Sequence, residues 1–238
     1  MSTHTRLTHS SLTHTRSTDN AKYGRLTAVL LIVWLATSIT ASRLSIFHAG
    51  PKYGVFPLIA FGLSALLPIA FFLLWFTVSR RFRQFALSLN PMALTIAQTW
   101  RIGGITFVTL QVFHILPGVF AQPAGWGDFF IGITAPFVAL YLARPGHKRL
   151  FLAWNIAGVF DLVTAITLGV LSSTGVGVLR PPVSTDAMTV LPLSLVPTFA
   201  VPLLLIVHII LITQAMGWQT QSVNPIAKAP VQPSIARA

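Results

Sequence analysis

The chain has 238 residues, of which 54% are hydrophobic and only 8% are charged, and its formal net charge is +12. A soluble domain carries about 25% charged residues, and a water-soluble fold of this size has too small an interior to hide so much apolar surface. The composition therefore excludes a soluble globular domain and predicts an all-α integral membrane protein, because lipid solvates the outward faces of apolar helices. Cysteine is absent, which excludes disulfides, thiolate metal ligands and cysteine nucleophiles.

The first 24 residues form a basic segment rich in Ser, Thr and His. Such a composition cannot bury enough apolar surface to offset the entropy lost on ordering, so we predict a disordered tail over residues 1–24. Its histidines recur every five positions at His4, His9 and His14, a spacing suited only to weak chelation, and we predict no metal site there. Residues 218–238 are predicted to form a flexible cytoplasmic tail.

Six segments of the chain are long and apolar enough to cross a bilayer. A hydrocarbon core about 30 Å thick requires about 20 helical residues. The segments are 26–47, 55–79, 93–117, 126–143, 150–173 and 198–216. They predict a bundle of six transmembrane helices over residues 25–217.

Lys and Arg residues gather in the N-terminal segment and in the loops after the second and fourth predicted spans. Because positive residues favour the cytoplasmic side, we predict that both termini are cytoplasmic. Contact with anionic headgroups of the lipid bilayer accounts for the positive charge. No basic helix with interleaved exposed aromatic residues is present, so we predict no nucleic-acid partner. Basic inner loops without an extracytoplasmic domain suit a bacterial inner membrane.

Three ionisable residues are predicted to lie deep in the bilayer. Counted from the cytoplasmic ends of their spans, Arg101 and His208 lie about 12 Å deep, and Asp161 lies about 16 Å deep. Each charge costs about 2.5–3.5 kcal/mol in a membrane unless it finds a partner. A cluster of these three, with Asn155 beside them, satisfies all of them. It fits a proton-linked or anion-binding site, and it equally fits a polar clamp that only fixes helix register.

A second pair is predicted near the outer surface. His114 precedes Pro117 at the end of the third span, and Asp128 begins the fourth after a short connection. These two side chains are expected to meet at an outer mouth. The alternative is an acid that stabilises the start of its helix through the helix dipole.

The segment Gly125-Trp126-Gly127-Asp128 resembles the GxGD signature of intramembrane aspartyl proteases. The resemblance implies two aspartates that share a proton, with Asp161 as the second. The chain departs from that family in two ways. Asp128 is predicted near the surface, and the order of the two aspartates is reversed.

Haem ligation is the cofactor alternative. His114 and His208 are the only histidines within predicted spans. They differ in depth by about 10 Å, whereas two axial ligands approach one iron at similar depth. We therefore predict no cofactor, and one-histidine haem ligation is the alternative that stays open.

The sequence favours a small-solute or proton-coupled transporter that uses the central cluster and has no enzymatic activity. The first alternative is a non-catalytic accessory or assembly protein whose helices serve a partner complex. The second is a membrane-embedded enzyme with redox or hydrolytic activity. A six-helix unit this small is expected to work as a homo-oligomer, and nothing in the sequence identifies the small-molecule substrate.

Overall fold

The computed structural model describes residues 4–48, 56–176 and 178–219 of the chain. Over these residues every regular element is a helix, and none of them forms a strand. This confirms the all-α class that the composition predicts.

Five helical runs within the described residues are long and apolar enough to cross a membrane. They belong to α1 (His4–Arg43), α2 (Phe56–Val78), α6 (Gly118–Phe137), α7 (Lys148–Leu171) and α8 (Val201–Gly217). In α1 the apolar run is Asn20–Arg43, and in α2 it is the whole helix. The other three runs include the short π- and 3₁₀-helical turns beside their helices and are Gly118–Leu142, Pro145–Leu171 and Val196–Gly217. The length and composition of these helices indicate a membrane protein.

The third predicted span, 93–117, is not one of these five runs. The chain instead forms α4 (Pro91–Ile96), the 3₁₀-helix η1 (Ala97–Gly104) and α5 (Ile105–Val112). Asn90 begins α4, and its side chain accepts hydrogen bonds from the first backbone N–H groups of that helix. The predicted segment is therefore helical without a gap from Pro91 to Val112, with 3₁₀ geometry in its middle, and its crossing of the membrane stays a prediction.

Two predicted boundaries also differ from the structure. Helix α6 begins at Gly118, eight positions before the predicted start of the fourth span at residue 126. Helix α1 begins at His4 and runs through most of the segment predicted to be disordered. Extending an existing helix is far easier than nucleating one, so an apolar helix can carry a polar extension. The predicted C-terminal tail lies outside the described residues from position 220 onward.

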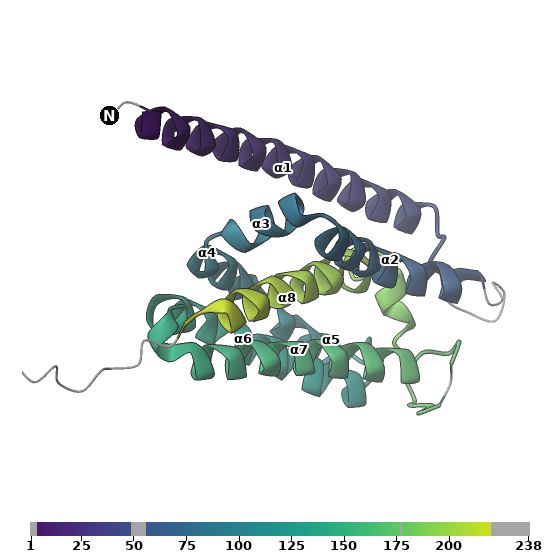
Figure 1. Ribbon diagram of the computed structural model, residues 1–238. Coiled ribbons are helices and arrows are strands. Elements are labelled where there is room, and N and C mark those ends of the chain that lie inside the picture. Colours follow the sequence, from purple (N-terminus) through teal and green to yellow (C-terminus); the bar gives the residue numbers. More distant parts are fainter. Residues whose placement is uncertain (1–3, 49–55, 177, 220–238) are drawn as a thin grey trace, which may run out of the picture.

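Helix α8 lies in the middle of the bundle, between α2 on one side and α7 on the other (Figure 1). The run from α4 to α5 and helices α6 and α7 form the densest part of the protein, with α6 packed along η1. Helix α1 runs along the outside of the bundle (Figure 1). It is held there by few contacts, one of which is a 3.0 Å hydrogen bond from Trp34 Nε1 to the carbonyl of Thr198.

A short amphipathic helix, α3 (Arg80–Ser88), joins α2 to α4. Its residues Phe82 and Phe85 are buried, whereas its arginines are exposed. Phe82 stacks on Trp75 with ring centroids 3.7 Å apart. This helix was not predicted, although its alternation of Arg and Phe is typical of a helix lying at a membrane surface.

Candidate functional site

Arg101 lies at the centre of the bundle on η1, and its side chain is only 1% exposed. A 3₁₀-helix has three residues per turn, so side chains at positions i and i+3 lie directly above one another. Gln98, Arg101 and Gly104 therefore share one line along η1, and all three are buried. The 3₁₀ segment keeps this line facing α6, α7 and α8, where an α-helix would turn it away by about 60° over three residues.

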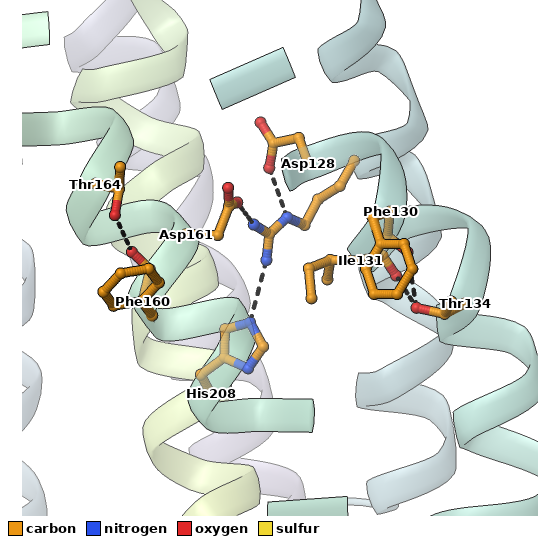
Figure 2. A network of polar contacts seen from close by, with 9 residues as sticks. Asp128, Phe130, Ile131, Thr134, Phe160, Asp161, Thr164 and His208 are labelled. Atoms are coloured by element: carbon orange, nitrogen blue, oxygen red, sulfur yellow. Dashed lines mark hydrogen bonds and ion pairs between the residues drawn. The ribbon is translucent and has the colours of Figure 1, made fainter. Parts of the chain in front are cut away.

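Two aspartates from neighbouring helices bind the Arg101 guanidinium. Its Nε donates to Asp128 Oδ1 on α6 at 2.6 Å, and one terminal nitrogen donates to Asp161 Oδ2 on α7. Figure 2 shows Asp128, Asp161 and His208 converging on the guanidinium from three sides. Hydrogen bonds between a guanidinium and carboxylates are among the strongest in proteins, so this contact joins three separate helical segments.

The other terminal nitrogen of Arg101 lies 3.2 Å from His208 Nε2 on α8. An arginine only donates, so His208 Nε2 accepts this hydrogen bond. His208 Nδ1 lies 2.9 Å from Asn155 Oδ1, and the Asn155 amide nitrogen donates to the Phe151 carbonyl at 2.9 Å. Asn155 Oδ1 is thus an acceptor, and Nδ1 carries the proton. This pattern fixes a neutral imidazole with one defined tautomer.

The charges of the cluster do not cancel. Arg101 contributes one positive charge, Asp128 and Asp161 contribute two negative charges when ionised, and neutral His208 contributes none. One negative charge is left over in a site that is almost closed to solvent. Because an uncompensated buried charge is costly, the arrangement can bind one proton or one further cation.

Three glycines allow the polar side chains to approach one another. A Cβ atom on Gly104 would lie 2.3 Å from Asp128 Cβ, and one on Gly158 would lie 2.5 Å from the His208 ring. A Cβ atom on Gly127 would overlap with Asp161 Oδ1 at 1.6 Å. Each glycine thus provides the space for one ligand of the guanidinium, as small residues do between membrane helices.

The structure brings together most of the residues predicted from the sequence. Arg101, Asp161, His208 and Asn155 form one connected network, as their depths predict. The role of that network in binding or transport stays a prediction.

The predicted contact between His114 and Asp128 at an outer mouth is wrong, because Asp128 binds a different residue. Asp128 lies ten residues into α6, about 15 Å from the helix start, because α6 begins at Gly118. It binds Arg101 and belongs to the central cluster. His114 lies exposed just after α5, with a backbone φ of 56°.

The GxGD-like segment has another explanation in this structure. Gly125 lies against η1 and α5, where an added Cβ atom would be 2.7 Å from Val108, and Gly127 makes room for Asp161. Arg101 binds both Asp128 and Asp161. A carboxylate dyad that shares one proton needs its two acids in direct contact, and here each is bound to a cation instead.

Gln98 is the residue that sequence reasoning missed. It is fully buried, and neither atom of its amide has a hydrogen-bond partner among the described residues. A buried amide without partners costs about 1–3 kcal/mol, which makes this position a candidate for bound water or solute. Its spacing of three from Arg101 was the available signal, but only a 3₁₀-helix makes that spacing place both side chains on one line.

The cluster is poorly suited to haem, because both nitrogens of His208 are engaged by Arg101 and Asn155. In the part of the chain that the structure describes, no group of three or more His, Cys, Asp or Glu residues is placed to hold a metal ion.

Comparison with known protein families gives one match, to a family described as a domain of unknown function (DUF8737), over residues 56–216. The chain belongs to this family. The DUF8737 match begins at the first residue of α2, ends within α8 and includes every residue of the central cluster. No curated protein and no solved structure matches the chain.

Proposed function

We propose that this DUF8737 protein is a proton- or cation-coupled transporter of a small solute, with the Arg101 cluster as its coupling site. The observation that carries the proposal is a single guanidinium bound by two aspartates in a nearly solvent-free site. One of the two carboxylates needs a proton or a cation to neutralise it. Coupling requires that binding of the proton or cation and binding of the solute change each other's free energy, and a charge shared within one site provides such a link.

The form of the surrounding helices supports the same function. The helical run from α4 to α5 changes to 3₁₀ geometry at η1 beside the cluster, and α6 contains Pro123 and Pro136. Transporters commonly build midplane sites from interrupted helices, because the freed backbone groups there line a polar site and do not face lipid. The amide of Gln98, which has no hydrogen-bond partner among the described residues, lies one 3₁₀ turn before Arg101 and extends the polar site toward the start of η1.

In this proposal the run from α4 to α5 crosses the membrane as a sixth span, and both termini are cytoplasmic. The host membrane is a bacterial inner membrane, and the protein works as a homo-oligomer. Exposed apolar residues on α2, including Leu66, Phe71 and Leu74, would face lipid or a second copy.

The test is solute-driven proton flux in proteoliposomes that contain a pH-sensitive dye. A panel of small amines, amino acids, sugars and carboxylates is added in turn to the wild-type protein and to Asp161→Asn. We expect at least one solute to change the internal pH with the wild type and none with Asp161→Asn, which neutralises the extra charge. If no solute moves protons with the wild type, or if Asp161→Asn moves them equally well, coupling at this site is wrong.

Asp186→Asn is the matched control. Asp186 begins a short 3₁₀-helix between α7 and α8, and its two carboxylate oxygens accept hydrogen bonds from the backbone N–H of Thr174, at 3.0 Å, and from the Thr174 hydroxyl. The substitution removes one negative charge far along the chain from the cluster and preserves an accepting oxygen. We expect it to leave the flux unchanged.

A second candidate function is a non-catalytic accessory protein. It is favoured by the exposure of α1 and α2, since only 6% of the residues in the most apolar 18-residue stretch of each helix are buried. A surface that large could seat a partner's helices. This function predicts a partner that co-purifies with the protein and an absence of flux for all solutes in the panel.

A further inference from the structure

A pocket of about 280 Å³ opens between α6 and α7 beside the central cluster. Its lining includes Pro123, Gly127, Phe130, Phe160, Asp161 and Thr164. The rings of Phe130 and Phe160 are 61% and 72% exposed, so the pocket faces outward from the bundle, toward lipid in a membrane. Figure 2 shows Asp161 between Phe160 and Thr164 of α7 and Phe130 and Ile131 of α6.

The polar side-chain atoms that line this pocket are hydrogen-bond acceptors. Asp161 uses Oδ2 for Arg101, and its Oδ1 lies against Gly127 without a hydrogen-bond partner among the described residues. The Thr164 hydroxyl donates its proton to the Phe160 carbonyl at 2.8 Å, which leaves the oxygen as an acceptor. An occupant that bonds to these atoms must therefore bring the donors.

The charge and the shape of the pocket narrow the class of occupant further. With both aspartates ionised the cluster carries one excess negative charge, and Asp161 is its member that lines the pocket. Phe130 and Phe160 also line the pocket, and the face of an aromatic ring attracts a cation. The remainder of the lining is apolar and open to the side, which suits a hydrocarbon tail.

We infer that this pocket binds a protonated amphipathic amine that enters sideways from the bilayer, with its ammonium group on Asp161 Oδ1 and Thr164 Oγ1. The headgroup amine of a phospholipid is a poor occupant, because it carries a negatively charged phosphate that would find only hydrogen-bond acceptors among the side chains described above. The inference deepens the proposed function by naming its solute class, but binding itself does not require transport.

The experiment uses the full chain in phosphatidylcholine nanodiscs at neutral pH. Decylamine, decanol and decanoate are compared by equilibrium dialysis against empty nanodiscs. We expect decylamine to bind saturably with one molecule per protein, decanol to bind at least tenfold more weakly, and decanoate to show no excess over empty nanodiscs. Equal excess binding of decylamine and decanoate would overturn the inference, because partition into apolar surface does not distinguish charge.

Two variants locate the site. Ala157→Phe places a ring in the pocket, whereas the control Ala153→Phe changes another exposed alanine one turn away on α7 that does not line it. We expect Ala157→Phe to weaken decylamine binding at least tenfold and Ala153→Phe to change it less than twofold. Asp161→Asn should weaken binding at least tenfold without changing the shape of the pocket, so a folding defect in Ala157→Phe would still leave a decisive variant. Wild-type affinity in both Ala157→Phe and Asp161→Asn would place the amine elsewhere.

The experiments can contradict amine binding in the pocket and coupled transport at the Arg101 cluster independently of each other. If decylamine binds as expected but no solute drives proton flux, the pocket is an amine site and the transport function is wrong. If other solutes drive flux that depends on Asp161 while decylamine does not bind, transport stands and the amine class is wrong.

Discussion

At the scale of single residues, the Arg101 side chain connects η1 to three other helices of the described part of the protein. It is almost completely buried and binds Asp128, Asp161 and His208, which come from three different helices. Because its donors point in fixed directions from a planar group, the three partners must be held at defined positions. A lysine at this position would have no fork with which to bind both carboxylates.

Removing the guanidinium should destabilise the protein strongly. In Arg101→Met the side chain keeps its approximate volume, but two carboxylates are left together in a site that excludes water. Breaking a buried ion pair by removing one partner costs about 3–5 kcal/mol. We expect a loss of this size in the free energy of unfolding, measured by titration with SDS in mixed micelles.

The triple variant Arg101→Met, Asp128→Asn, Asp161→Asn is the control for that loss. It removes all three formal charges and replaces the two carboxylates by asparagine amides, which still form hydrogen bonds. We expect it to recover most of the lost stability, since neutral replacements of buried ion pairs are often well tolerated. If the single variant is as stable as the wild type, the charges of the cluster are not buried as the structure indicates.

At the scale of elements, the 3₁₀ segment η1 and its glycines decide which residues meet. Gly103 and Gly104 are neighbours on η1 with opposite surroundings. Gly103 is exposed and an added Cβ atom meets nothing within 4 Å, whereas Gly104 is buried against Asp128. The two positions therefore form a matched pair in sequence and in local structure.

Gly104→Ala should be destabilising and Gly103→Ala should not. A Cβ atom at Gly104 would be 2.3 Å from Asp128 Cβ, so α6 must move away from η1. Overpacking of this kind costs about 1–3 kcal/mol, whereas alanine at an exposed helical position is neutral or stabilising by up to about 1 kcal/mol. The same SDS titration measures both. Equal stability of the two variants would contradict the close approach of α6 to η1.

The elements also show why the sequence predicts some features and not others. Long apolar segments predict α2, α7 and α8 well, because length and composition alone decide whether a helix can cross a membrane. The start of α6 was missed because residues 118–125 contain two glycines and a proline, which is typical of a loop in a soluble protein. In a membrane protein the same residues continue a helix, since water is absent and neighbouring helices satisfy the backbone.

In the candidate site, too, the sequence predicts some residues and misses others. The depth of Arg101, Asp161 and His208 could be counted from the span ends, so their meeting was predictable. The place of Asp128 could not be counted correctly, because its depth depends on the missed start of α6. The importance of Gln98 depends on the three-residue turns of η1, because only a 3₁₀-helix places positions 98 and 101 on one line, and the spacing alone does not distinguish it from an α-helix.

At the scale of the whole molecule, the described helices divide into a well-packed part and a loosely attached part. The family match begins at α2 and includes the packed helices α6, α7 and α8, whereas α1 lies outside the match and along the outside of the bundle (Figure 1). Among the contacts that attach α1 are the hydrogen bond of Trp34 and a 2.7 Å hydrogen bond between the hydroxyls of Ser42 and Ser194. The central cluster is therefore built entirely by residues of the matched region.

The number of membrane crossings is the whole-molecule property that the proposed function most depends on. The chain has no cysteine, so single cysteines can be introduced and labelled with a membrane-impermeant maleimide in intact cells. Three exposed positions are suitable: Arg81 on α3, His114 after α5 and Gly146 in the turn before α7.

With six crossings and a cytoplasmic N-terminus, we expect only His114→Cys to be labelled from outside, and the other two only after the membrane is permeabilised. If the run from α4 to α5 does not cross, Gly146→Cys alone is labelled from outside. If the whole bundle is inverted, Arg81→Cys and Gly146→Cys are both labelled and His114→Cys is not. Because each topology gives a different pattern, labelling of these three positions decides whether Arg101 lies on a helix that spans the bilayer.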